Sequence, residues 1–220
     1  MIVNERYTDY INSLTGFLED DLEELYEKAK ADRIPVIRRE TQALLGFLIT
    51  EKQPCHILEV GTAIGFSALF MSGFLPKDGR ITTIEKYEKR IPVARENFRR
   101  FGREKQIKLL EGDAMQILAN LPQESYDMVF MDAAKGQYIH FLPLVKKVLA
   151  PGGVLISDNV LQDGQIIESR FAVTRRDRTI HERMREYLYA LTHDDELESS
   201  VLTVGDGVAL SVKKKGRETC

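Results

Sequence analysis

The sequence predicts an α/β fold: a seven-stranded mixed sheet with helices on both faces and an N-terminal helical extension. Short runs rich in β-branched residues alternate with amphipathic helical periods through the middle of the chain, which is typical of a parallel sheet with crossover helices. The last two strand-like runs are joined by Gly205-Asp206-Gly207, a turn typical of an antiparallel hairpin. Five parallel strands and this hairpin give the seven.

Each element has its own signal in the sequence. The strands are expected at His56–Val60, Arg80–Glu85, Ile107–Glu111, Met128–Asp132, Val154–Ser157, Ser199–Val204 and Val208–Val212. The amphipathic helices are expected near Glu19–Lys30, Thr41–Lys52, Ser67–Phe74, Glu88–Phe101, Ala114–Leu121 and Tyr138–Leu149. We expect a single domain over residues 1–220, with N-terminal helices at 1–52 and an α/β core at 53–220.

The composition is that of a globular protein without a membrane segment. Hydrophobic residues make up 43% and charged residues 30% of the 220, and no apolar run approaches the roughly 20 residues that span a bilayer. The N-terminus has no basic region followed by an apolar stretch, so no signal peptide is expected. Cys55 and Cys220 are the only cysteines, which fits a reducing cytoplasm. Because the net charge is −3, nucleic-acid binding would need a local basic patch.

Three oxygen-bearing side chains follow two apolar runs that we expect to be neighbouring strands. Asp132 ends one run, and Asp158 and Asn159 end the other. Since neighbouring parallel strands end side by side, these residues are expected to converge on one hard cation. Two carboxylates and an amide carbonyl suit Mg²⁺, and Lys135 would overhang the site. Taken singly, each residue can instead be a helix cap or a turn former.

The run Ile57–Val60 leads into a glycine turn at the start of a helix. Gly61 allows a close backbone approach, and Gly65 removes a side chain where the helix begins. The pattern is not the G-x-G-x-x-G of dinucleotide enzymes, and Glu59 would repel a pyrophosphate at the helix N-terminus. A ligand that carries an ammonium and a sulfonium group tolerates this acid. Alone, the pattern is weak, because glycine turns after strands are common.

Two further strand ends carry acids that suit a nucleoside. Glu85 ends the second strand, where an acid can accept both ribose hydroxyls. Asp113 follows the third strand and can bond an adenine amino group, while Ala114 offers its backbone N–H. Either acid can instead cap a helix. Three strand ends with suitable chemistry in order indicate a cofactor that contains a nucleoside.

From Pro35 onward, the chain resembles the class I S-adenosylmethionine (SAM)-dependent O-methyltransferases of the cation-dependent catechol/caffeoyl-CoA type. The matching residues are 58–67 (LEVGTAIGFS), Glu85, 112–114 (GDA), 132–138 (DAAKGQY) and 158–159 (DN). The resemblance implies a Rossmann-like fold, SAM and Mg²⁺ as cofactors, and a homodimer, which is typical of the family.

The resemblance also implies a role for each matching residue. Asp132, Asp158 and Asn159 are the implied metal ligands. Lys135 is the implied base, and it can alternatively act only by positioning the substrate. The residues expected to bind SAM are Glu59, Gly61, Ser67, Glu85, Asp113, Ala114 and Asp132.

Departures from the family pattern point to one branch. Ala134 stands where plant caffeoyl-CoA enzymes usually carry another acid, Ala133-Ala134 replace bulky residues of catechol enzymes, and the chain has no Trp. The motif 132–138 and the segment 176–184 (RDRTIHERM) are similar to the bacterial branch that methylates 5-hydroxyuridine at the tRNA wobble position. The implied product is 5-methoxyuridine, and the implied partner is the tRNA anticodon loop.

Residues 170–185 contain six arginines, two acids and no lysine. Arginine suits phosphate contacts and base stacking, so this segment is a candidate RNA contact, with Arg38 and Arg39 as possible additions. The residues expected to touch RNA are Arg38, Arg175, Arg176, Arg178 and Arg183. The alternatives are a solvated helix face, or ion pairs with the acidic residues 19–24 or with a partner subunit.

Other functions compete with this interpretation. The same chemistry on a small catechol or phenylpropanoid acceptor is the main alternative. An NAD-dependent oxidoreductase is disfavoured by the missing G-x-G and by the paired carboxylates. A non-enzymatic RNA-binding module would need only the basic segment.

Overall fold

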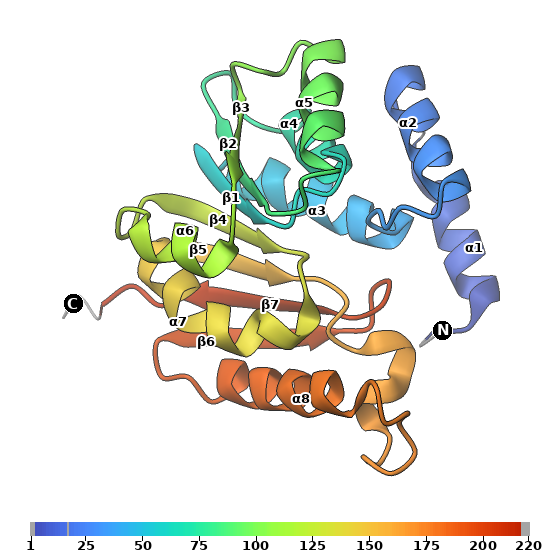
Figure 1. The fold of residues 1–220 in the computed structure, drawn as a ribbon, viewed down its shortest axis with the longest axis vertical. Coiled ribbons are helices and arrows are strands. Elements are labelled where there is room, and N and C mark those ends of the chain that lie inside the picture. Colours follow the sequence, from blue (N-terminus) through green and yellow to red (C-terminus); the bar gives the residue numbers. More distant parts are fainter. Residues whose placement is uncertain (1–2, 17, 217–220) are drawn as a thin grey trace. The chain divides into compact units, whose positions relative to one another are not determined.

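The computed structural model describes residues 3–16 and 18–216 and has the predicted α/β architecture (Figure 1). Seven strands form a mixed sheet in the order β3-β2-β1-β4-β5-β7-β6. By contacts, the chain divides into two compact units, Val3–Ala114 and a second that begins at Met115. They are called the N-terminal unit (residues 3–114) and the C-terminal unit (residues 115–216) below.

The N-terminal unit has three helices before its first strand. Its elements are α1 (Glu5–Leu14), α2 (Asp20–Ala31), α3 (Arg39–Lys52), β1 (His56–Val60), α4 (Phe66–Ser72), β2 (Arg80–Glu85), α5 (Ile91–Arg100) and β3 (Ile107–Glu111). The three strands pair in parallel, with Val60 opposite Ile84 and Glu85 opposite Glu111. Their carboxyl ends therefore lie along one edge, where the polar residues of interest follow.

The helix α4 explains why α2 and α3 group with this unit. All seven of its residues, FSALFMS, are buried, so it needs neighbours on every side. Helices α2 and α3 both contact α4, and the Tyr26 and Phe66 rings lie 5.4 Å apart. The N-terminal helices thus cover the helix that begins at the glycine turn.

The C-terminal unit contains the rest of the parallel strands and the hairpin. Its elements are α6 (Ala114–Asn120, which begins at the last residue of the N-terminal unit), β4 (Tyr126–Met131), η1 (Lys135–Gln137), α7 (Tyr138–Val148), β5 (Leu149–Ser157), η2 (Gln162–Ile167), α8 (Arg178–Thr192), β6 (Leu197–Leu202) and β7 (Val208–Lys213). Strands β4 and β5 are parallel, and β7 pairs antiparallel with both β5 and β6. The run 128–131 in β4 is fully buried, as expected of a strand covered on both faces.

The strands β1, β2 and β3 have the predicted boundaries. The strand β6 lies two residues earlier than predicted, β4 begins two residues earlier at Tyr126, and β7 ends one residue later at Lys213. The strand β5 begins at Leu149 rather than Val154, because Leu149 already pairs with Tyr126 across a register shift. The strand β4 ends at Met131, so Asp132 stands just beyond its end. In addition, none of the helices in the described part of the chain has the length and apolar character needed to cross a bilayer.

Candidate active site

The glycine turn after β1 is held by the neighbouring strand. The backbone N–H groups of Gly61 and Thr62 donate to the Ile84 carbonyl at 3.1 and 3.2 Å. Gly65 has φ +84°, and a Cβ there would lie 2.5 Å from the Phe98 ring. Both the backbone conformation and the close packing therefore require glycine at position 65.

Glu59 lies inside the protein rather than at the edge of the turn. It is fully buried, and its two carboxylate oxygens accept hydrogen bonds from Ser67 on α4 and Thr83 on β2. The Thr62 hydroxyl lies 2.5 Å from that of Thr83. Glu59 and Ser67 thus hold the turn, α4 and β2 together from within. Their direct contact with SAM stays a prediction.

Glu85 reaches across to the same turn. Its Oε2 accepts the Ala63 N–H at 2.8 Å, and its Oε1 accepts the N–H groups of Lys86 and Tyr87 at 2.9 and 2.8 Å. A carboxylate has about four acceptor positions, and these three N–H groups use three of them. One position of Oε2 is therefore left, where acceptance of both ribose hydroxyls was expected, and the ribose contact stays a prediction. The side chain that was expected to bind ribose therefore also fixes the glycine turn.

Asp113 and Ala114 follow β3 at the same strand edge. The Gly112 N–H donates to the Glu85 carbonyl at 2.8 Å, which joins the ends of β2 and β3. Asp113 is exposed, with the Lys86 ammonium 3.8 Å from its carboxylate, and Ala114 begins α6. The structure thus brings Gly61, Glu85 and Asp113 to one edge of the N-terminal unit.

Asp132 and Asp158 follow paired residues of the C-terminal unit. Met131 at the end of β4 lies opposite Ser157 at the end of β5, so the two aspartates occupy neighbouring strand ends. Asp158 is 1% exposed and its Oδ1 accepts the Asn159 N–H at 2.8 Å. Asn159 has φ +58°, in the left-handed region that asparagine tolerates better than most residues.

The carboxylates of Asp132 and Asp158 repel each other when both are ionised. Burial raises the pKa of Asp132, partly offset by the charge of Lys135. Burial and then the charge of Asp132 raise the pKa of Asp158, and Asp206 adds to that shift. Among the described residues, no three His, Cys, Asp or Glu side chains are grouped as ion ligands. A cation here would therefore be held by two carboxylates and an amide oxygen, with water completing the shell, which fits Mg²⁺.

Tyr138 ties the two aspartate-bearing strand ends together. Its hydroxyl lies 3.1 Å from the Met131 carbonyl and 3.2 Å from the Asp158 carbonyl, and it accepts the Ala133 N–H at 3.2 Å. The side chain is fully buried. Tyr138 was part of the matching motif but had no predicted role, because its partners belong to two different strands.

Lys135 faces an acid from the far end of the chain. It lies in η1, and its Nζ is 3.9 Å from the Asp206 Oδ2. Asp206 is 5% exposed, although the sequence indicated only a hairpin-turn residue at this position. Lys135 and Asp206 are about 70 residues apart in the sequence, so no local sequence pattern could have predicted that they pair.

The arginine segment has two kinds of residue. Arg178 and Arg183 donate to the carbonyls of Val173 and Gly136 at 3.3 and 3.2 Å, so their guanidinium groups are partly used within the unit. Arg175 and Arg176 are exposed in the loop before α8. Arg38, the fifth predicted RNA contact, belongs to the N-terminal unit and precedes α3.

Comparisons with known proteins agree with this arrangement. A sequence profile for the family described as O-methyltransferase matches residues 12–214. The catechol O-methyltransferase of Niastella koreensis is 32% identical over 169 residues, which is 74% of this chain and 76% of that protein. Tapetum-specific methyltransferase 1 of Arabidopsis thaliana is 30% identical over 158 residues, 70% of this chain and 68% of that protein.

Solved structures show the same fold. The crystal structure of a putative caffeoyl-CoA O-methyltransferase from Staphylococcus aureus has a TM-score of 0.86 and 30% identity, over 96% of this chain and 99% of that one. The SAH-bound Podospora anserina methyltransferase PaMTH1 has a TM-score of 0.85 and 26% identity, over 96% and 95%. By the matched profile, the identity to these relatives and the common fold, this chain belongs to the class I SAM-dependent O-methyltransferases of the catechol/caffeoyl-CoA type.

Proposed function

We propose that the protein uses Mg²⁺ and SAM to methylate the 5-hydroxyl of 5-hydroxyuridine at the tRNA wobble position, giving 5-methoxyuridine in the cytoplasm. The observation that carries the cation-dependent chemistry is the pair of carboxylates at neighbouring strand ends, the half-buried Asp132 and the buried Asp158. Mg²⁺, when bound by these residues and Asn159, supplies Lewis-acid polarisation of the two adjacent oxygens of the acceptor.

Lys135 is proposed to take the proton of the acceptor hydroxyl at its Nζ. The oxygen lone pair then forms the bond to the methyl carbon, and the carbon–sulfur electron pair stays on sulfur. The contribution of the chain is to hold the acceptor oxygen in line with that bond. The position of Lys135, a third exposed and close to Asp206, leaves its amine accessible to an acceptor.

The N-terminal unit is proposed to bind SAM at the strand edge described above. Gly61 would admit the cofactor close to the backbone, the Oε2 of Glu85 would accept a ribose hydroxyl, and Asp113 with Ala114 would bond the adenine. Glu59 and Ser67 would act from inside, by keeping the turn in shape. Asp132 is the remaining predicted SAM contact.

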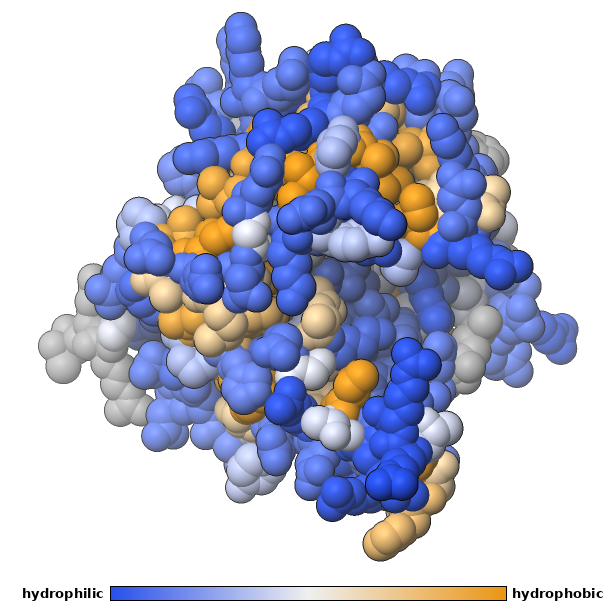
Figure 2. All heavy atoms as spheres, in the orientation of Figure 1, coloured by the Kyte–Doolittle hydropathy of each residue, from blue (hydrophilic) through white to orange (hydrophobic). Residues whose placement is uncertain are grey.

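The surface before α8 supports an RNA acceptor. Phe171 and Ile167 are 86% and 81% exposed, and Arg175 and Arg176 are exposed in the same loop. In Figure 2, hydrophilic and hydrophobic side chains stand together at the loop that precedes α8 in Figure 1. Exposed aromatic and arginine side chains together favour unpaired nucleotides, since rings stack on bases and guanidinium groups bond phosphates.

A small catechol or phenylpropanoid acceptor is the second candidate. It is favoured by the relatives, among them the Niastella koreensis protein named catechol O-methyltransferase. A catechol also offers two adjacent oxygens, so the same cation site would serve it.

The choice between the two acceptors can be tested with purified protein and SAM. The protein is given undermodified tRNA in one assay and catechol in another. The proposal expects 5-methoxyuridine in nuclease digests of the tRNA by mass spectrometry, and a kcat/KM for catechol at least tenfold lower. Asp158→Ala should abolish the product.

The pair Arg175→Ala/Arg176→Ala should lower tRNA methylation at least tenfold, whereas Lys77→Ala/Lys105→Ala, which removes the same charge from exposed sites elsewhere, should not. Methylation of catechol alone contradicts the RNA acceptor.

We also propose a homodimer, from the apolar surface of the N-terminal helices. Helix α1 has no buried residue, and more than half of each apolar side chain on one face is exposed: Tyr7, Tyr10, Ile11 and Leu14. Such a face on an amphipathic helix needs a partner. A second copy of the chain would supply one by two-fold symmetry.

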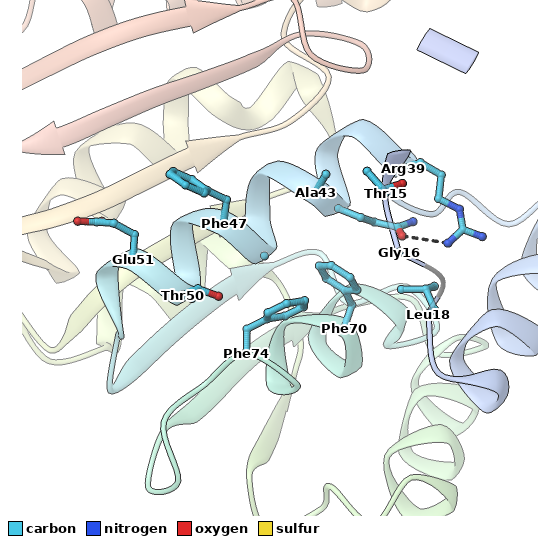
Figure 3. Close-up of a pocket in the computed structure, with 12 residues that line it drawn as sticks. Thr15, Gly16, Leu18, Arg39, Ala43, Phe47, Thr50, Glu51, Phe70 and Phe74 are labelled. Carbon is cyan, nitrogen blue, oxygen red and sulfur yellow. Dashed lines mark hydrogen bonds between the residues drawn. The ribbon is translucent and has the colours of Figure 1, made fainter. Parts of the chain in front are cut away.

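A groove of about 740 Å³ in the same unit offers a second apolar surface to a partner copy (Figure 3). It is lined by residues of the α1–α2 connection, α3, α4 and the turn after α4, with Phe47, Phe70 and Phe74 as its aromatic members. Sedimentation of wild-type protein should give a dimer, and Tyr10→Glu/Leu14→Glu should give a folded monomer. The control Glu5→Gln/Asp9→Asn changes polar residues of α1 and should remain dimeric. A monomeric wild type at micromolar concentration contradicts this proposal.

A further inference from the structure

The Gly205-Asp206-Gly207 turn of the hairpin is fitted onto the segment that follows the second aspartate. The N–H groups of Val160 and Leu161 donate to the carbonyls of Gly207 and Asp206 at 3.0 and 3.1 Å. Gly207 has φ +87°, and a Cβ there would lie 2.8 Å from the Leu161 backbone nitrogen. The turn therefore has one position relative to residues 158–161, and Asp206 is placed with it.

The Asp206 carboxylate has two different partners. Its Oδ1 accepts the Asp163 N–H, and its Oδ2 lies 3.9 Å from the Lys135 Nζ. An asparagine would accept the Asp163 N–H equally well, so the turn itself does not need a charge. A carboxylate that is only 5% exposed costs desolvation energy unless an opposite charge is close. Lys135 supplies that charge.

Asp206 does not belong to the proposed cation ligands. Within residues 3–16 and 18–216, no set of three acidic, His or Cys side chains is arranged to hold an ion. Its Oδ2 forms an ion pair with the Lys135 Nζ at 3.9 Å, and its charge also raises the pKa of Asp158. The amine is thus a positive group that the Asp206 carboxylate faces.

We propose that Asp206 is the positioning residue of Lys135. Lysine is a point charge on a flexible four-carbon stem, and the carboxylate fixes where its amine lies. Lys135 first loses a proton to water, and the free amine then takes the proton of the acceptor hydroxyl. This re-forms the ammonium beside Asp206, which stabilises it until that proton passes to water in turn. This inference rests on the proposed role of Lys135 as the base, and it holds for either acceptor.

A double-mutant cycle tests the pair, with Asp206→Asn, Lys135→Met and the double variant. Single-turnover formation of S-adenosylhomocysteine is followed with the acceptor that the wild type methylates. Asp206→Asn should lower the rate at least tenfold, with KM for SAM and Tm close to wild type, because Asn still accepts the Asp163 N–H. Asp206→Glu should recover most of the rate. In the Lys135→Met background, Asp206→Asn should change the rate less than twofold.

The control Asp195→Asn removes one exposed acid of the same unit and should leave the rate unchanged. A wild-type rate in Asp206→Asn, or an equal loss with and without Lys135, overturns the proposal. An equal loss would mean that Asp206 acts on something other than the lysine.

A second measurement needs no acceptor and therefore separates this proposal from the proposed function. Acetic anhydride labelling of Lys135, read by mass spectrometry against the exposed Lys77, reports how far the contact with Asp206 restrains the amine. The charges that face Lys135 are Asp132, Asp158 and Asp206. Asp206→Asn should speed labelling at least threefold, and an unchanged rate overturns the proposal. If the wild type methylates neither tRNA nor catechol, the proposed function fails while the labelling still decides this one.

Discussion

The phenol oxygen of Tyr138 lies 3.2 Å from the backbone carbonyl of Asp158. Tyr138 begins α7, directly after the short helix that carries Lys135. The same hydroxyl contacts the end of β4. One side chain thus sets the separation of the two strand ends that carry the carboxylates.

Replacing Tyr138 by Phe should loosen these strand ends. The substitution leaves the Ala133 N–H without its acceptor and removes the hydroxyl from the Met131 and Asp158 carbonyls. Leaving buried polar groups unpaired costs about 1–3 kcal/mol, which urea denaturation would measure. We also expect Mg²⁺ affinity to fall at least tenfold by calorimetry. Tyr189→Phe, at a mostly exposed tyrosine of α8, is the matched control, and equal behaviour of the two variants would refute the role of the hydroxyl.

Asp158→Asn should stabilise the metal-free protein at pH 8. Burial and the charge of Asp132 raise the pKa of Asp158 to about 7. Because this pKa is higher in the folded than in the unfolded state, the carboxyl makes its full contribution to stability only below the unfolded pKa of about 4. That contribution is lost as the pH rises through the folded pKa of about 7. The free energy of unfolding of the wild type should therefore fall between pH 4 and 8 more than that of the variant. Parallel curves from urea melts would contradict this.

Mg²⁺ should protect the protein more at pH 8 than at pH 6. Protons compete with the cation for Asp132 and Asp158, since burial raises the pKa of both carboxyls. The rise in Tm on adding Mg²⁺ should therefore grow with pH, and EDTA should abolish both this rise and turnover. Asp158→Asn serves as the control because it removes one proposed ligand. Turnover that survives EDTA would exclude the cation-dependent mechanism.

Gly65→Ala should damage the glycine turn after β1, which we propose to bind SAM. The residue has φ +84°, and its new Cβ would lie 2.5 Å from the Phe98 ring. Strain of this kind costs about 1–3 kcal/mol, and we expect SAM affinity to fall at least tenfold. Adding Phe98→Leu should restore part of the stability by making room, while the backbone strain remains. A fully stable Gly65→Ala protein in thermal melts would show that the turn is not constrained as described.

Local patterns were sufficient for the strands and for the residues at their ends. The runs His56–Val60, Arg80–Glu85 and Ile107–Glu111 are strands with the predicted boundaries, because short apolar and β-branched runs are recognisable from neighbouring residues alone. The strand β5 was predicted too short, since Pro151-Gly152-Gly153 has the composition of a turn. Its extension depends on pairing with β4, which no local pattern reports.

The sequence by itself determined the family, the polar residues that follow each strand and the candidate ligands, because strand ends and glycine turns consist of consecutive residues. Only the tertiary structure decided where those groups face. It placed Glu59 inside, bonded to Ser67 and Thr83, and it brought Asp206 to Lys135 from the far hairpin. The physical reason is that a buried polar group takes its partner from whatever the fold packs against it, at any distance along the chain.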